Sequence, residues 1–280
     1  MANGQWEDWV GTSQTLDDTC VPTPALAMAA TLGRPVDFAS DMPMPHPWLW
    51  LYFLPLASAS DMGTDGHPKR GGFLPPIAQP RRMWAGSRMA MHDAARIGDP
   101  LTKVSTITAV TEKQGGAGEM AFVTVQHEVS AAGRRVLSEQ QDIVYMNIPP
   151  RFTPPKAKPL PTDCDWTETV PLDPVLLFRF SALTFNGHRI HYDRPYAMDV
   201  ENYPGLVVHG PLQAILLYDA ACRQSPGKIP ASFSFRGIHP LFEHDSVSLN
   251  GRMDGDVLEL MTANQDGTIC MQAKLTWAPA

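Results

Sequence analysis

The sequence lacks the features that mark secreted, zinc-binding and membrane-spanning proteins. Its four cysteines, at positions 20, 164, 222 and 270, form neither a CxxC pair nor a Cys/His ligand spacing. A disulfide framework and a zinc site are therefore not expected, and the thiols fit a reducing compartment. The longest apolar run, residues 47–60 (PWLWLYFLPLASAS), contains prolines and is too short to span a bilayer.

Basic residues are also in deficit. The chain has 22 Lys and Arg against 29 Asp and Glu, a net charge of −7 and a pI of about 5.7. General nucleic-acid binding needs a basic face, so we expect no nucleic-acid partner, although a local basic pocket for an anionic ligand stays open. The first residues, MANGQWEDWVGTSQT, show no basic start followed by an apolar run. This favours a soluble cytoplasmic protein without a membrane partner.

Proline, by contrast, is abundant, and its distribution divides the chain. At 44% hydrophobic and 18% charged residues, the 280-residue chain can build a core as one large domain or as two of about 140 residues. The densest central proline cluster, IPPRFTPPKAKPLPTD, can neither pair as a strand nor continue a helix. We therefore expect an N-terminal unit (1–147), a stiff linker (148–163) and a C-terminal unit (164–280).

Each unit shows a helix followed by antiparallel strands. In the N-terminal unit, residues 23–33 predict a short helix that ends at Gly33, and residues 48–55 (WLWLYFLP) predict a buried, extended segment. Residues 101–147 predict a long meander, with hairpin turns at KQGGAGE (113–119) and SAAGRR (130–135). The Gly- and Pro-rich stretch 57–77 predicts a long loop, which we expect to cover the ligand pocket.

The C-terminal unit contains the clearest helix, residues 210–224, with Leu212, Ile215, Leu216 and Ala220 on one face. Strands are expected within 231–242, 246–264 and 268–280, separated by turns at MDGD (253–256) and QDGT (265–268). A helix followed by several antiparallel strands, twice, predicts an α+β fold in which a sheet wraps a helix.

The stretch LTFNGHRIHYDRPYA (183–197) concentrates hydrogen-bonding groups ahead of that helix. His191 can take a proton from water and return one near neutral pH. Asn186 can orient the water or a substrate carbonyl, but it cannot accept a proton. Asp193 either fixes the tautomer of His191 or caps the next helical turn, and both interpretations stay open.

The helix itself begins with His209-Gly210-Pro211. A glycine at a helix start lets backbone N–H groups approach a ligand, and the positive end of the helix stabilises negative charge that develops on an oxygen. A base beside such a site suits α-proton or water-addition chemistry next to a thioester carbonyl. The alternative for each group is structural: an ordinary helix entrance, a histidine that bonds the backbone, or a surface charge at Arg189.

At these residues the sequence resembles the MaoC-like hydratase and dehydratase branch of the hotdog superfamily, whose pattern is similar to GDxNPxHxD…A followed by HG. The segments 185–197 and 207–215 fall on this pattern. Asn186 stands where the family usually has its catalytic aspartate, and His191 stands on the catalytic histidine. Asp193 falls on the second aspartate, while His188-Arg189 replaces the usual Asn-Pro pair.

A narrower subgroup resembles this chain in both departures and in PRRMWAGS (80–87). It contains hydroxyacyl-thioester dehydratases and mesaconyl-CoA or itaconyl-CoA hydratases. The resemblance implies a double hotdog, two fused hotdog units with the catalytic cluster in the C-terminal one. It also implies a hydro-lyase that adds water reversibly to an enoyl-CoA. His191 would transfer protons, Asn186 would position water or substrate, and Gly210 would polarise the thioester oxygen.

The arginines of residues 80–89 point to the acyl group. Arginine matches carboxylate and phosphate oxygens with two parallel hydrogen bonds, so Arg82 above all, with Arg81 and Arg88, is expected to meet an acyl carboxylate or a CoA phosphate around Trp84. A solvated basic turn anchored by Trp84 is the alternative. The remaining substrate-binding candidates all lie in the second unit: His188, Arg189, Tyr192, Asp193 and His209.

The expected substrate is a short branched dicarboxylic enoyl-CoA, mesaconyl-C4-CoA or itaconyl-CoA, hydrated to citramalyl-CoA. No metal or other cofactor is expected, because coenzyme A enters as part of the substrate. Three alternatives stay open: a 3-hydroxyacyl-thioester dehydratase of fatty-acid synthesis, a thioesterase, and a non-catalytic acyl-CoA-binding protein, for which Asn186 is the best argument. A homodimer is also left open.

Overall fold

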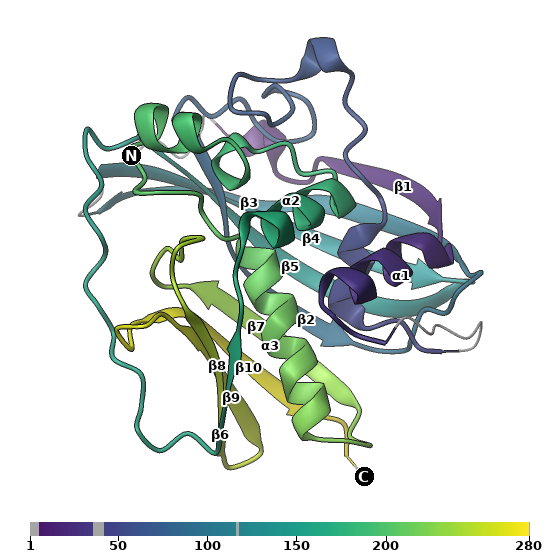
Figure 1. The fold of residues 1–280 in the computed structure, drawn as a ribbon. Helices are drawn as coiled ribbons and strands as arrows, with labels where there is room; N and C mark the ends of the chain where they lie inside the picture. The colour runs from purple at the N-terminus through teal and green to yellow at the C-terminus, as the bar shows by residue number, and fades with distance from the viewer. Residues whose placement is uncertain (1–5, 36–41, 116–117, 280) are drawn as a thin grey trace.

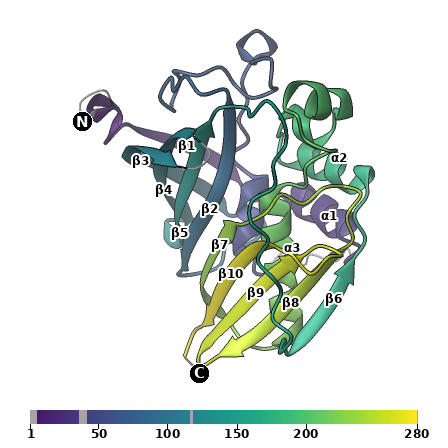
Figure 2. The ribbon, with the colours of Figure 1, turned by 90° about the vertical axis from the view of Figure 1, so that its left-hand side faces the viewer.

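The computed structural model describes residues 6–35, 42–115 and 118–279, and Figure 1 shows their arrangement. The described strands form one antiparallel sheet of ten, in the order β1-β3-β4-β5-β2-β7-β10-β9-β8-β6. Three α-helices lie on one side of this sheet, as the two views in Figures 1 and 2 show. The predicted α+β class is therefore confirmed.

The first half of the sheet comes from the N-terminal part of the chain. Its strands are β1 (Ser13–Thr19), β2 (Arg81–Met91), β3 (Pro100–Gly115), β4 (Gly118–Ala131) and β5 (Arg134–Met146). The predicted meander is confirmed, because alternate residues of β4 such as Val123 and Val125 are buried. Its second turn uses Ala132 and Gly133 at positive φ. Residues 116–117 of its first turn lie outside the described residues.

The second half comes from the C-terminal part of the chain. Its strands are β6 (Trp166–Val170), β7 (Pro230–Gly237), β8 (Val247–Asp254), β9 (Val257–Ala263) and β10 (Ile269–Trp277). Gly255 and Gly267 take positive φ at the two predicted hairpin turns. The helix α3 (Gly210–Gln224) begins and ends where its sequence predicts, and it packs on β7, β8, β9 and β10.

Two more α-helices lie beside α3. The predicted N-terminal helix is α1 (Pro22–Thr31), and Gly33 follows it at φ +64°. The helix α2 (Pro174–Leu183) was not predicted, although Asp173 is a typical N-cap ahead of a proline and accepts a hydrogen bond from the Leu176 amide at 2.7 Å.

One local prediction is wrong. Residues 48–55 were expected to be extended, but His46–Leu51 form the 3₁₀ helix η2. Trp48 and Leu51 are buried as expected. Pro45 and Pro47 fix helical-range φ angles at the start of the turn, and packing against α1 and α3 favours a compact turn over a strand.

The halves join where β2 pairs with β7. Gly86 is required there, since a Cβ at this position would lie 2.3 Å from the Phe235 carbonyl oxygen. Segment 148–163 contains no helix or named strand, only a bridge from Pro159 to Thr268, and it runs along one side of the molecule in Figure 1. Because one sheet runs through both halves, we keep the division into 1–147 and 164–280 as a proposal.

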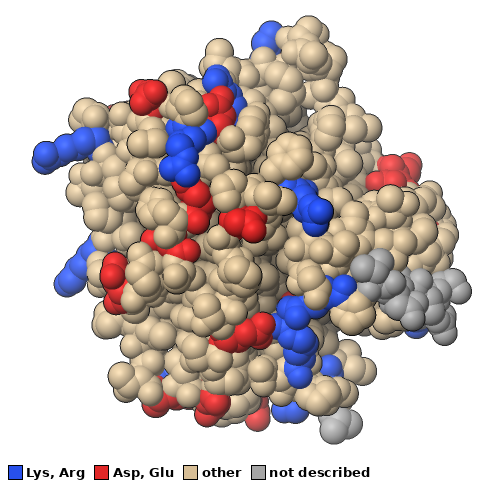
Figure 3. Space-filling model, viewed as in Figure 1, with Lys and Arg blue, Asp and Glu red and all other residues tan. Residues whose placement is uncertain are grey.

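The surface gives no sign of a large single-charge patch on the face shown in Figure 3, where basic and acidic side chains are interspersed. Within the described ranges, no helix has the length and apolar character needed to cross a bilayer.

Candidate active site

A cavity of about 1150 Å³ opens between the two halves of the molecule. The second half contributes residues from the end of α2, from the segments 184–192 and 207–211, and Tyr203 to its wall. The first half contributes the loop 54–74, the start of β2 and inward-facing residues of the meander. The loop 57–77, which was expected to cover the ligand pocket, contributes Ala57, Met62, His67 and Leu74 to the lining of this cavity.

His191 lies on this cavity as a neutral imidazole. It ends the 3₁₀ turn η4 (Arg189–His191), and its Nδ1 lies 2.7 Å from the Val207 carbonyl oxygen. A carbonyl only accepts, so Nδ1 carries the hydrogen and Nε2 keeps its lone pair. Burial lowers the pKa of His191 well below its usual value, and the neighbouring His209 and His188 lower it further. The ring is therefore unprotonated at neutral pH.

His209 holds the His191 ring in place. The two imidazoles stack with centroids 3.7 Å apart and an interplanar angle of 19°. His209 is fully buried, and its Nε2 lies 2.8 Å from Ser181 Oγ. Burial lowers its pKa to about 3. His209 does not line the cavity, so the structure places it behind the His191 ring and not against the cavity.

Asn186 presents a donor to the cavity. Its Oδ1 accepts a hydrogen bond from the His188 amide at 3.0 Å. Because an amide nitrogen cannot accept, this contact fixes the orientation of the side chain and leaves Nδ2 as the free group. Phe185, just before it, takes φ +49°, an unusual backbone angle for a bulky residue. The local turn thus leaves a neutral hydrogen-bond donor on a residue that lines the cavity.

Gly210 is the first residue of α3, so its N–H has no acceptor within the helix. It lines the cavity beside Asn186 and His191. A Cβ built there would meet Trp84 O at 3.8 Å and Met271 Cε at 3.9 Å, which are ordinary contacts. The protein interior therefore does not demand glycine here, and the missing side chain leaves room for a ligand atom.

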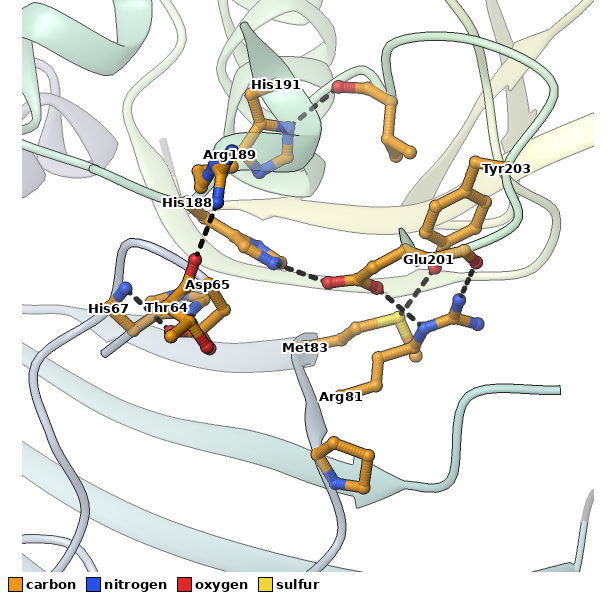
Figure 4. Close-up of polar contacts among 12 residues, drawn as sticks. Thr64, Asp65, His67, Arg81, Met83, His188, Arg189, His191, Glu201 and Tyr203 are labelled. Carbon is orange, nitrogen blue, oxygen red and sulfur yellow. Dashed lines mark hydrogen bonds and ion pairs between the residues drawn. The ribbon is translucent and has the colours of Figure 1, made fainter. Parts of the chain in front are cut away.

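His188 belongs to a buried ionic network that Figure 4 shows. Its Nε2 lies 3.3 Å from Glu201 Oε1, and Arg81 Nε donates to Glu201 Oε2 at 2.9 Å. Burial raises the pKa of Glu201, but the His188 hydrogen bond and the Arg81 charge outweigh burial and lower it overall. Arg81 also stacks on the Tyr203 ring at 4.3 Å. Arg81 is thus a buried counter-ion and does not line the cavity.

The loop 57–77 adds a further histidine, His67, which was not among the predicted site residues. Asp65 Oδ2 lies 3.0 Å from His67 Nδ1, and the His67 ring lies 4.1 Å from that of His188. Burial lowers the pKa of His67 to about 4. The loop is docked tightly, because a Cβ at Gly66 would lie 1.8 Å from the Gly187 carbonyl oxygen. The motif Asp65-Gly66-His67, inside the loop that was expected to cover the ligand pocket, could have indicated this histidine.

Asp65, His67 and His188 are residues of the types that bind metal ions. One ligand atom each from Asp65, His67 and His188 lies within 4.8 Å of the others. The Asp65 carboxylate already accepts from both the Nδ1 and the amide of His67. Its pKa is lowered, since these bonds outweigh the effect of burial. Asp65 and His67 therefore already bond each other, and His188 bonds Glu201 instead.

The three arginines of β2 lie in three different environments. Arg82 and Trp84 line the cavity. Arg82 sits opposite Tyr145 in the ladder and forms no ion pair within the part of the chain that the structure describes. A bulge between Trp84 and Gly86 shifts the alternation of β2. Arg88 therefore faces outward, where it bonds Asp142 and lies away from the cavity.

The remaining candidates lie at the rim of the site. Arg189 bonds Asp193 at 2.8 Å and the Thr64 carbonyl at 3.1 Å. Asp193 accepts from the Tyr196 amide at 3.1 Å, at the start of the π-helical turn η5 (Tyr196–Val200). Of the two interpretations of Asp193, the structure thus shows capping, and His191 Nδ1 is oriented by a backbone carbonyl instead. Tyr192 lines the cavity and donates to the Gly187 carbonyl.

Comparisons with known proteins agree on one family. A family model described as hydroxyacyl-thioester dehydratase type 2 matches residues 47–243. The mesaconyl-C(4)-CoA hydratase of Chloroflexus aurantiacus is 46% identical over 276 residues, 98% of each chain. The mitochondrial hydroxyacyl-thioester dehydratase type 2 of Schizosaccharomyces pombe is 26% identical over 227 residues, 71% of this chain and 75% of the relative.

Solved structures agree on the fold. A MaoC-like dehydratase from Phytophthora capsici matches with a TM-score of 0.69 and 14% identity, covering 96% of this chain and 97% of that one. HtdX of Mycobacterium tuberculosis matches with a TM-score of 0.67 and 15% identity, covering 95% and 100%. The expected fold, α+β with a double-hotdog architecture, is confirmed. A long helix was expected in each unit, but the helix of the first unit, α1, has only 10 residues.

Proposed function

Because the chain belongs to the hydroxyacyl-thioester dehydratase type 2 family, within the MaoC-like hotdog hydratases and dehydratases, we propose that it adds water reversibly to a short, branched dicarboxylic enoyl-CoA. The substrate is mesaconyl-C4-CoA, or its isomer itaconyl-CoA, and the product is citramalyl-CoA. The relative named mesaconyl-C(4)-CoA hydratase, 46% identical along nearly all of both chains, supports this substrate class.

The reaction needs one base and one oxyanion donor on the same cavity. His191 Nε2 removes a proton from a bound water as the water oxygen bonds to the β-carbon. The electron pair of the double bond moves toward the thioester, and the Gly210 N–H at the start of α3 stabilises the enolate oxygen. The protonated His191 then delivers its proton to the α-carbon. Water is consumed and the base is regenerated.

The free carboxylate of the substrate explains the roles of Arg82 and Asn186. In mesaconyl-C4-CoA the β-carbon carries both the methyl and the carboxylate group, so that charge lies beside the reacting atoms. Arg82 lines the cavity without an acidic partner among the described residues, and Asn186 offers Nδ2 as a neutral donor. Both groups favour an anion, whereas an aspartate at position 186 would repel one.

The observation that carries this proposal is that Asn186, His191, Gly210 and Arg82 all line one cavity. The test is an assay of purified protein with mesaconyl-C4-CoA, itaconyl-CoA and crotonyl-CoA, followed by loss of absorbance of the enoyl-thioester band. Faster turnover of crotonyl-CoA would remove the dicarboxylate from the proposal. Replacement His191→Ala should lower kcat by roughly 10²–10⁴-fold, with His92→Ala, at an exposed position, as the control.

The same assay separates the alternatives. Preference for C8 or longer monocarboxylic substrates would favour a dehydratase of fatty-acid synthesis, the activity named for the Schizosaccharomyces pombe relative. Release of free thiol would reveal a thioesterase, and tight binding without a change in absorbance would reveal a binding protein. An acyl-CoA partner and a cytoplasmic location are part of this proposal.

A further inference from the structure

The cavity extends well beyond the reacting groups, over the inner face of the first half of the sheet. A series of contacts leads there from Gly210, which lies next to Trp84. Trp84 packs edge-on against Trp50 with centroids 4.8 Å apart, and Trp50 Nε1 donates to Glu139 Oε2 at 3.0 Å. The cavity wall beyond the two tryptophans carries four polar side chains among apolar ones such as Val129 and Leu137. The polar ones are Lys103, His127, Glu139 and Gln141, which we call the polar wall.

Most of the polar wall is already satisfied by hydrogen bonds. His127 bonds Ser105 Oγ at 2.8 Å and Gln141 Oε1 at 3.0 Å. Glu139 accepts from Trp50 and, through Oε1, from Ser87 Oγ at 2.6 Å. The His127 and Glu139 side chains therefore have little capacity left to bind a ligand.

Lys103 is the exception. Its Nζ lies 4.8 Å from the centroid of the Phe53 ring and forms no hydrogen bond or ion pair with any residue that the structure describes. The two carboxylates that act on it electrostatically are Glu139 and Asp18. Both are engaged elsewhere, since Asp18 accepts from the Phe53 amide at 2.7 Å. The ammonium group therefore depends on water in the cavity for its hydrogen bonds.

Size alone cannot limit the acyl group, because a cavity of about 1150 Å³ is as large as pockets that enclose whole drug-sized molecules. An alkyl tail that passed the two tryptophans would displace the water around Lys103. A buried ammonium without hydrogen bonds is strongly unfavourable. A short acyl group that ends before the tryptophans leaves that water in place.

We propose that Lys103 determines acyl specificity: it excludes alkyl chains from the part of the cavity beyond Trp50 and Trp84 and so restricts the enzyme to short acyl-CoA substrates. This inference rests on the proposed function, since it assigns the substrate class of the same site. It predicts that removal of the charge, without loss of volume, opens the cavity to longer chains.

The variant Lys103→Met tests this, because methionine is unbranched, of similar length and apolar. The matched control is Lys113→Met, which removes an exposed lysine of the same strand whose Nζ lies 5.0 Å from the Phe122 ring. We would measure kcat/KM for trans-2-enoyl-CoA esters of four to ten carbons and for mesaconyl-C4-CoA. Each buried methylene contributes roughly fourfold to binding. Lys103→Met should therefore gain at least about tenfold on the C8 ester, while Lys113→Met matches the wild type.

An unchanged chain-length profile in Lys103→Met would overturn the inference, even if mesaconyl-C4-CoA is hydrated. If the wild type hydrates no ester, the proposed function fails, and the inference is decided by binding. Calorimetry with butyryl-CoA and octanoyl-CoA should then show a preference for the longer ester in Lys103→Met alone, and equal preference in both proteins would refute it. Lys103→Gln, which removes the charge and keeps polarity, gives an intermediate profile and serves if the methionine variant does not fold.

Discussion

The replacement Asn186→Asp tests how the site distinguishes acyl groups by charge. Asn186 Oδ1 accepts from the His188 amide at 3.0 Å. An aspartate in the same rotamer keeps this hydrogen bond and has nearly the same volume. The only change at the cavity is that a donor, Nδ2, becomes a negatively charged oxygen. We therefore expect the fold to be unaffected and the electrostatics of the site to be reversed.

The magnitude follows from Coulomb's law. A substrate carboxylate on the β-carbon would lie roughly 5 Å from the new oxygen, and at an effective dielectric constant of about 20 the repulsion is roughly 3 kcal/mol. This corresponds to a loss of about 10²-fold in kcat/KM for mesaconyl-C4-CoA. Crotonyl-CoA has no carboxylate on its acyl group, so its kcat/KM should change by less than about tenfold.

The assay compares the two substrates side by side at one pH and one ionic strength. The control is Asn264→Asp, since Asn264 Oδ1 also accepts from backbone amides, those of Asp266 and Thr268, but lies at a turn away from the cavity. Equal losses for both substrates in Asn186→Asp would refute the argument. Asn186 would then act on water or the thioester and not on substrate charge.

Two further predictions follow. The variant Gly210→Ala should fold normally, because the added Cβ makes only ordinary contacts. It should lower kcat/KM by roughly 10–10³-fold, because the methyl group crowds the oxyanion position. Wild-type activity with an unchanged melting temperature would contradict this prediction. The protein should lose stability as the pH falls from 6.5 to 4. His209 and His67 have pKa values of about 3 and about 4 in the folded protein. The unfolded chain therefore binds more protons than the folded chain in this pH range. Each histidine contributes a slope of at most about 1.4 kcal/mol per pH unit, partly offset by Asp219, whose pKa burial raises to about 6. Urea unfolding at pH 7.5, 6 and 5 measures the slope, and a flat profile would contradict it.

Local patterns in the sequence were sufficient to predict several helices and strands. The helix at 210–224 follows from its apolar face, and the meander at 101–147 follows from alternation and from turns rich in glycine. The motif residues Asn186, His191 and Gly210 belong to two short segments, and both segments line the same cavity. Short-range spacing was sufficient because each residue sits at a fixed place in a helix start or a tight turn.

Which charged groups line the cavity depends on how distant segments of the chain pack together. Arg81 and Arg82 are neighbours in sequence, yet one is buried against Glu201, 120 residues away, and the other faces the cavity. A strand sends successive side chains to opposite faces, and the bulge after Trp84 reverses that order for Arg88. His67 and Lys103 reach the cavity from a loop and from a strand of the first half, because the halves close around it. Such contacts depend on how distant segments pack, and no local pattern encodes them.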